Sequence, residues 1–86
     1  MTSEPKPTRS DIELELIRLL RDGLDQPGDV RPQTSFVADL GLESVQVIEY
    51  LCEVEDRYDL VIDEDSLSDV HTVADLAAVV ERLVAE

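Results

Sequence analysis

Reactive side chains are scarce in this 86-residue sequence, which contains one cysteine, one histidine and no tryptophan. The single cysteine, Cys52, excludes an internal disulfide and fits a reducing compartment. No apolar run approaches the length of a membrane span, and the opening residues MTSEPKPT lack the apolar core of a signal peptide. We therefore expect a cytoplasmic protein.

Basic residues are also few: seven Lys and Arg stand against 21 Asp and Glu, for a formal net charge of −14. Nucleic acid and anionic membranes both bind basic patches, so we expect neither as a partner. The charge favours proteins with basic surfaces, because opposite fields speed encounter and set orientation. The alternative is that the acidity only maintains solubility. We expect a monomer.

The sequence offers little for catalysis or metal binding. His71 has no predicted partner to orient it as a general base, and nothing in the sequence predicts an activated Cys52 thiol. Asp63 and Asp65 have the alternation of a calcium loop, but no glycine follows at its sixth position and no glutamate at its twelfth. A chain this short also buries only about 60% of its unfolded surface, too little for an enclosed cleft. We expect neither an enzyme nor a metal site.

Apolar periodicity predicts an all-α fold, a small bundle of three main helices and one short helix. Residues 1–8 read as a disordered tail, and a single domain follows over residues 9–86. A capping box of Ser10 and Glu13 opens the first helix. Its apolar face comprises Ile12, Leu16, Ile17, Leu20 and Leu24.

The rest of the chain predicts a long connection, two further main helices and a short turn. Over residues 25–43, the side chains of Phe36, Val37 and Leu40 are expected to pin the connection to the core. Residues 63–69 allow a short helical turn anchored by Leu67 and Val70. The last helix follows a cap pair of Thr72 and Asp75. Its inner stripe comprises Val73, Leu76, Ala77, Val80 and Val84.

The helix predicted from Ser44 to Tyr58 has two apolar faces. Its core stripe comprises Val47, Leu51, Val54 and Tyr58. Val45 and Cys52 lie nearly opposite that stripe, with Glu49 and Asp56 beside them and Ile48 and Glu55 further round. Scattered exposed apolar residues are normal. Two on one face with acids beside them instead favour a docking surface for partners with basic residues around an apolar patch.

Ser44 opens this helix and has two interpretations. It can be an N-cap, although Val47 stands where a capping box needs Glu or Gln. It can also be a modified hydroxyl, because a phosphate there meets the unpaired N–H groups of a helix start. Asp39 and Glu43 would offset that attraction, so a stable phosphate must be covalent. Local physics alone favours the cap.

The stretch SFVADLGLES, followed by VQVIEYLCEVEDRYDLVIDEDSLSDVHTVADL, resembles the acyl carrier protein family and its peptidyl carrier relatives over about residues 10 to 85. The family motif Gly-x-Asp-Ser-Leu reads here Gly41-Leu42-Glu43-Ser44-Val45. The resemblance implies that Ser44 carries 4′-phosphopantetheine, which a separate transferase attaches from coenzyme A. The thiol of the arm then holds acyl or aminoacyl intermediates as thioesters, and the carrier itself catalyses nothing.

The resemblance also implies partners: a phosphopantetheinyl transferase, an acyl- or aminoacyl-loading enzyme, and synthase, condensing or tailoring enzymes with basic docking patches. The candidate partner-binding residues gather at the start and outer face of the helix that Ser44 opens. They are Glu43, Val45, Ile48, Glu49, Cys52, Glu55 and Asp56.

Two departures from the family pattern bear on the pathway. Glu43 replaces the usual aspartate, which puts transferase preference in doubt, and Cys52 stands where a larger apolar residue is common. Both favour a dedicated carrier of a polyketide or other specialised-metabolite pathway over the carrier of primary fatty acid synthesis. We expect a freestanding acyl carrier protein that serves separate partner enzymes. The alternatives are a peptidyl carrier of nonribosomal peptide synthesis, then a carrier of primary fatty acid synthesis. A different class is an acidic interaction module without a cofactor, in which Ser44 is only a cap.

Overall fold

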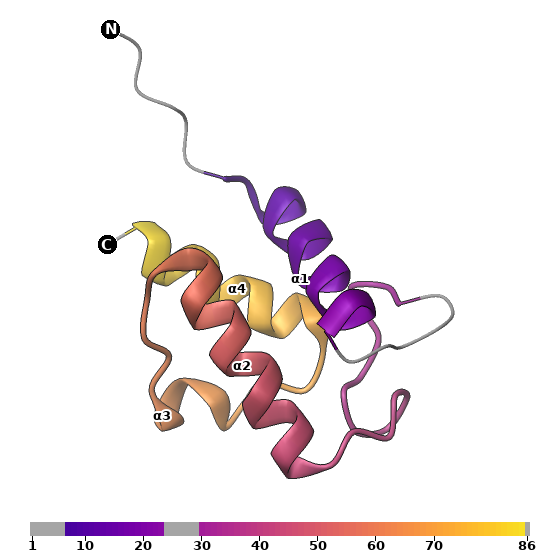
Figure 1. Cartoon of the computed structure of the whole chain (residues 1–86). Coiled ribbons are helices and arrows are strands. Elements are labelled where there is room, and N and C mark those ends of the chain that lie inside the picture. The colour runs from indigo at the N-terminus through magenta and orange to yellow at the C-terminus, as the bar shows by residue number, and fades with distance from the viewer. Residues whose placement is uncertain (1–6, 24–29, 86) are drawn as a thin grey trace, which may run out of the picture.

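The computed structural model describes residues 7–23 and 30–85, which form the predicted all-α bundle (Figure 1). Its four helices are α1 (Arg9–Gly23), α2 (Ser44–Tyr58), α3 (Glu64–Leu67) and α4 (Val73–Ala85). The described residues include no named strand. Ser35 and Thr72 form one isolated antiparallel bridge, which ties the α1–α2 connection to the start of α4.

α1 begins earlier than the sequence indicated. The Thr8 hydroxyl accepts the Asp11 N–H at 3.2 Å, and the Asp11 carboxylate accepts the Thr8 N–H at 3.1 Å. The predicted box of Ser10 and Glu13 is therefore wrong, because Thr8 and Asp11, two residues upstream, form the capping box of this helix. Most of the predicted tail, residues 1–6, and the predicted apolar residue Leu24 lie outside the described residues.

The predicted start of α4 is confirmed. The Thr72 hydroxyl accepts the Asp75 N–H at 3.1 Å, and the Asp75 carboxylate accepts the N–H groups of Thr72 at 3.1 Å and His71 at 3.0 Å. α3 is the predicted short turn, and its N-cap Asp63 accepts the Ser66 N–H at 2.9 Å. Short polar side chains thus begin both helices by satisfying donors that have no partner within the helix.

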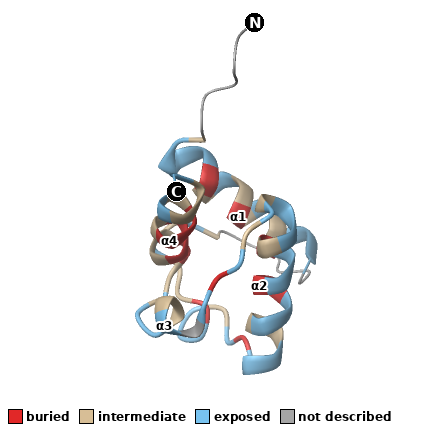
Figure 2. Cartoon of the chain, turned by 90° about the vertical axis from the view of Figure 1, so that its left-hand side faces the viewer, coloured by how far each residue is buried: buried red, intermediate tan, exposed pale blue. Residues whose placement is uncertain are grey.

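The core lies where the inner faces of α1, α2 and α4 meet, and α1 packs against both other helices (Figure 2). The connection between α1 and α2 is pinned by Phe36 and Leu42, both 4% exposed. Leu40 is partly buried, as expected of an anchor, but Val37 is 67% exposed, so its predicted role in the core is wrong. The tight turn between Phe36 and Leu42 directs Val37 outward.

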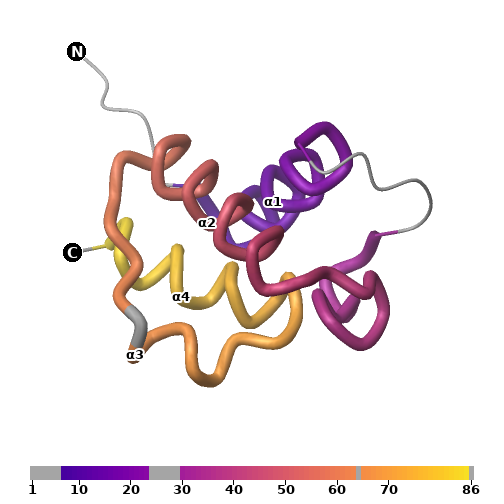
Figure 3. Tube along the Cα trace, turned by 60° about the horizontal axis from the view of Figure 1, so that its bottom comes forward, coloured from indigo at the N-terminus to yellow at the C-terminus, as the bar shows by residue number. Residues whose placement is uncertain are grey.

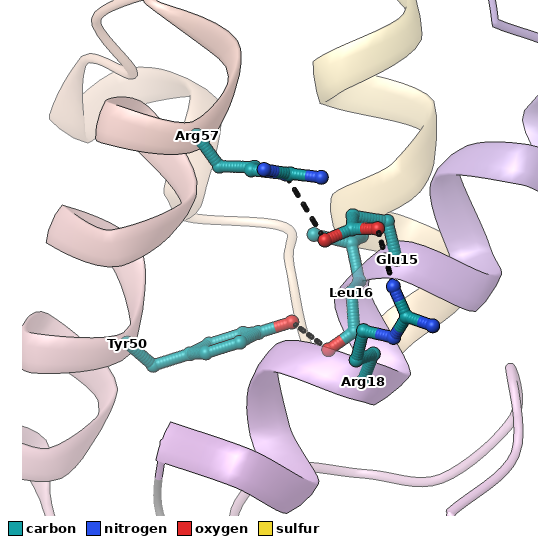
Figure 4. Close-up of polar contacts among 5 residues, drawn as sticks. All are labelled: Glu15, Leu16, Arg18, Tyr50 and Arg57. Atoms are coloured by element: carbon teal, nitrogen blue, oxygen red, sulfur yellow. Dashed lines mark hydrogen bonds and ion pairs between the residues drawn. The ribbon is translucent and has the colours of Figure 1, made fainter.

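Tyr50 is a core residue that the apolar stripe did not identify. It is 2% exposed, and its hydroxyl donates to the main-chain oxygen of Leu16 at 2.8 Å across the α1–α2 contact (Figure 4). Near the same contact, Arg57 reaches the Glu15 carboxylate at 3.1 Å. The stripe residues Val47 and Tyr58 are only partly buried, so the buried face of α2 is rotated towards Tyr50.

Within the described residues, no helix is long and apolar enough to cross a membrane.

Candidate functional site

Ser44 is the first residue of α2 and not its cap. The N-cap is Glu43, with extended backbone angles of φ −82° and ψ 161°, and its N–H donates to the side-chain oxygen of Gln46 at 2.9 Å. The Ser44 side chain is exposed, and its hydroxyl has no hydrogen-bond partner among residues 7–23 and 30–85. The interpretation of Ser44 as a cap is therefore wrong. The predicted cap paired Ser44 with the position of Val47, whereas the observed pair, Glu43 and Gln46, is one residue earlier.

A turn stabilised by hydrogen bonds positions the start of α2. Gly41 adopts a positive φ of 64°, and its N–H donates to the Val37 carbonyl at 3.0 Å. The Leu42 N–H donates to the Phe36 carbonyl at 3.0 Å, and both of these side chains are buried. Glycine adopts a positive φ without steric strain because it has no Cβ, so Gly41 lets the chain reverse between two core anchors. The turn therefore holds Ser44 at a fixed point on the surface.

Ser44 borders an apolar groove of about 640 Å³. Its apolar wall includes Phe36, Leu42, Val47, Leu51, Leu67 and Val70. The polar residues along it are Glu43, Ser44 and Tyr50. Burial, with a smaller effect of nearby Tyr58, raises the pKa of Tyr50 far above its usual value, so its hydroxyl stays protonated and donates to Leu16. The inner wall is therefore suited to a hydrocarbon group.

The outer face of α2 carries the exposed apolar residues expected of it. Val45 is 55% and Ile48 59% exposed, and Cys52 is an exposed free thiol. The carboxylates of Glu49 and Asp56 are also on the surface. These five residues are placed as the docking interpretation requires.

Glu55 differs from the other predicted partner-binding residues. Its side chain is partly buried and accepts the Ile62 N–H at 2.8 Å. This bond fixes the connection from α2 to α3, which lies at the opposite end of the molecule from the connection between α1 and α2 (Figure 3). Glu55 thus has a structural contact that spacing along one helix could not indicate.

The residues at the start of α2 fit a covalently attached phosphate arm. Such an arm needs an accessible hydroxyl, and the exposed Ser44 hydroxyl has no competing hydrogen bond from any residue that the structure describes. The helix start favours negative charge on that oxygen, and the groove offers an apolar surface beside it. Within the part of the chain that the structure describes, no group of three or more His, Cys, Asp or Glu residues is placed to hold a metal ion.

Comparison with known proteins agrees with this geometry. Residues 15–80 match the family described as "Phosphopantetheine attachment site". The chain is 31% identical over 81 residues to an acyl carrier protein of Rhodococcus erythropolis, a match that covers 92% of this chain and 88% of the relative. It is 35% identical over 74 residues to acyl carrier protein 3 of Ralstonia nicotianae, covering 84% and 85% of the two chains.

A further group of relatives is longer than this chain. The meromycolate extension acyl carrier protein of Mycolicibacterium aurum is 34% identical over 61 residues, covering 71% of this chain and 63% of the relative. The chain thus spans less than two thirds of the length of that relative. The family match and the two relatives of similar length nevertheless confirm the resemblance inferred from the motif around Ser44. The chain belongs to the acyl carrier protein family, whose members are carrier domains for covalently attached 4′-phosphopantetheine and not enzymes.

Proposed function

We propose that Ser44 is the attachment residue and that residues 9–86 act as an acyl carrier domain. The observation that carries the proposal is the exposed Ser44 hydroxyl, which is spared from capping because Glu43 and Gln46 make the bond at the helix start. Attachment from coenzyme A joins Ser44 Oγ to the pantetheine-bearing phosphorus, releases adenosine 3′,5′-bisphosphate and passes the hydroxyl proton to a base of the transferase. When attached, the group supplies a thiol that holds acyl cargo as a thioester.

The groove beside Ser44 favours acyl over aminoacyl cargo. An aminoacyl group carries a charged ammonium, whose burial against an apolar wall is costly without a partner. The groove volume of about 640 Å³ lies within the range of about 300–1,000 Å³ usual for small-molecule sites. Loading a saturated acyl chain should shift the methyl NMR signals of Val47 and Val70, and loading an amino acid should not. Equal shifts with both cargoes would contradict this preference.

The pathway that this carrier serves is the finer part of the proposal. Glu43 and Cys52 support a polyketide or other specialised pathway of acyl extension. The relatives named for meromycolate extension support a fatty-acid-like pathway as the alternative. The exposed free thiol of Cys52 fits a reducing compartment, so we place the protein in the cytoplasm.

The partners would be the transferase, a loading enzyme and synthase or tailoring enzymes that meet the surface around Ser44. This surface presents Val45, Ile48 and Cys52 among the carboxylates of Glu43, Glu49 and Asp56. Partner enzymes should therefore offer Arg and Lys residues around an apolar contact.

Intact-protein mass after incubation with coenzyme A and a broad-specificity phosphopantetheinyl transferase tests the assignment of Ser44. Wild type should gain one phosphopantetheine group and Ser44→Ala none. Ser10→Ala is the matched control, because Ser10 is also an exposed serine in the first turns of a helix; it should be modified like wild type. Modification of Ser44→Ala, or failure of folded wild type with its own transferase, would refute the proposal.

A further inference from the structure

Val37 is a large apolar side chain held away from the core. It is 67% exposed although its neighbour Phe36 is buried. The turn around it is fixed by hydrogen bonds: the Ala38 N–H donates to the Ser35 hydroxyl at 3.0 Å, and the Asp39 carboxylate accepts the Ser35 N–H at 2.7 Å. The Val37 carbonyl itself accepts the Gly41 N–H. The backbone that presents Val37 is therefore held by hydrogen bonds, although most of its side chain lies in solvent.

Val37 borders the same groove as Ser44 and Ile48. Val37 comes from the turn before α2, whereas Ile48, which is 59% exposed, comes from α2 itself. Two exposed apolar side chains from different elements thus flank the candidate attachment residue. An enzyme that forms a bond to Ser44 Oγ must bring its surface to this place and cover at least part of both.

The chain segment that carries these two residues has charge of one sign only. The segment from Pro32 to Asp56 contains no Lys, Arg or His. Its exposed acids nearest in sequence to Ser44 are Asp39, Glu43 and Glu49. A partner that covers Val37 and Ile48 would therefore need basic residues at the edge of the contact, because like charges there would oppose binding.

We propose that Val37 and Ile48 are paired apolar contacts for the transferase that acts at Ser44, which would meet them with apolar residues surrounded by Arg and Lys. The inference rests on the proposed function of Ser44 and adds the turn before α2 to a docking surface otherwise confined to one helix. A strip on a single helix leaves a partner free to rotate about the helix axis. A second contact on the turn removes that freedom and fixes the approach to Ser44.

Matched valine substitutions test the contact. Val37→Ser and Val61→Ser each remove an exposed valine, but Val61, 80% exposed, does not line the groove. With coenzyme A saturating, the transferase should act on Val37→Ser with kcat/KM lowered about fivefold to tenfold through KM. Val61→Ser should stay within about twofold of wild type, as expected of a residue outside the interface.

Salt dependence separates the apolar contact from the charged edge. Salt screens exposed charges, so the penalty of Glu49→Gln should shrink between low and high ionic strength. The penalty of Val37→Ser should persist, because burial of apolar surface does not depend on that screening. Val37→Thr keeps the branched shape and is the control for misfolding. It should lower kcat/KM less than Val37→Ser does and leave the thermal midpoint of unfolding unchanged.

The outcomes distinguish this inference from the proposed function. If wild type is modified and Val37→Ser is as good a substrate as Val61→Ser, the paired contact is refuted while the role of Ser44 stands. If folded wild type is not modified even by its own transferase, the proposed function fails and the inference fails with it. A KM increase specific to Val37→Ser supports both.

Discussion

The starts of α2 and α4 each carry a hydroxyl residue, and the two hydroxyls are used differently. At α4 the Thr72 hydroxyl accepts the Asp75 N–H. The first two N–H groups of the helix, those of Val73 and Ala74, donate to the Thr34 and Pro32 carbonyls of the connection before α2. At α2 the cap bond is made by Glu43 and Gln46, and the Ser44 hydroxyl remains without a partner among the described residues. A hydroxyl at the N-cap position, as at Thr72, bonds the helix start. A hydroxyl one position later, as at Ser44, stays accessible.

The helices α2 and α4 also differ in how far their apolar side chains are buried. In α4 the apolar residues Val73, Leu76, Ala77 and Val80 are fully buried. In α2 the buried residues Leu51 and Val54 share their helix with the exposed Val45 and Ile48. The apolar residues of α4 thus serve mainly the stability of the core. Those of α2 stabilise the core on one face of the helix and form an accessible surface on the other.

The largest expected effect comes from removing an apolar side chain from each helix. Leu76→Ala should lower the free energy of unfolding by about 2–5 kcal/mol, because it leaves a cavity at a fully buried position. Ile48→Ala should change it by no more than about 0.5 kcal/mol, because Ile48 lies mostly in solvent. Urea unfolding followed by circular dichroism measures both. Equal losses would mean that Ile48 belongs to the core and that the two helices do not differ in this way.

A smaller effect tests the two hydroxyls directly. Thr72→Ala should destabilise the protein by about 1 kcal/mol, because the Asp75 N–H loses its acceptor at the helix start. Ser44→Ala should leave the free energy of unfolding within a few tenths of a kcal/mol of wild type, although it removes the proposed attachment oxygen. The same urea titrations give both values. A loss at Ser44 as large as at Thr72 would restore the cap interpretation.

The bundle and much of the site were accessible from the sequence because their signals are local. The spacing of Ile12, Leu16 and Leu20 predicts a buried helix face, and the pair Thr72 and Asp75 predicts a helix start; both are confirmed. The family motif around Ser44 identified the family correctly.

The errors concern contacts that the sequence order hides. Tyr50 can be buried in the core because its hydroxyl finds an acceptor in the Leu16 carbonyl on another helix, and periodicity along α2 carries no information about that partner. Val37 points outward because Gly41 turns the backbone between Phe36 and Leu42, so its apolar character was a poor guide to burial. The cap of α2 was missed because the long side chains of Glu43 and Gln46 do what the short side chain of Ser44 was expected to do.

The pH dependence of stability sharpens the comparison at the start of α4. The hydrogen bond from the His71 N–H is the largest cause that holds the pKa of Asp75 below its usual value of 3.8. Hydrogen bonding with Thr72 lowers this pKa further, and slight burial opposes the shift. A carboxyl with a lower pKa in the folded state stabilises the protein above the unfolded pKa, and this contribution is lost as pH falls through the folded pKa. We therefore expect the stability difference between wild type and Asp75→Asn to be largest above pH 3.8 and to narrow in more acidic solution.

Ser44→Ala provides the contrast in the same measurement. The Ser44 hydroxyl that it removes is neutral in this pH range and makes no hydrogen bond within residues 7–23 and 30–85. The small stability difference of this variant from wild type should stay constant as pH falls, while that of Asp75→Asn narrows. Chemical denaturation at a series of pH values between 3 and 6, a range set by the usual carboxyl pKa of about 4, measures both. A constant difference for Asp75→Asn would show that its carboxylate does not hold the start of α4, and the two helix starts would then differ only in the position of their hydroxyls.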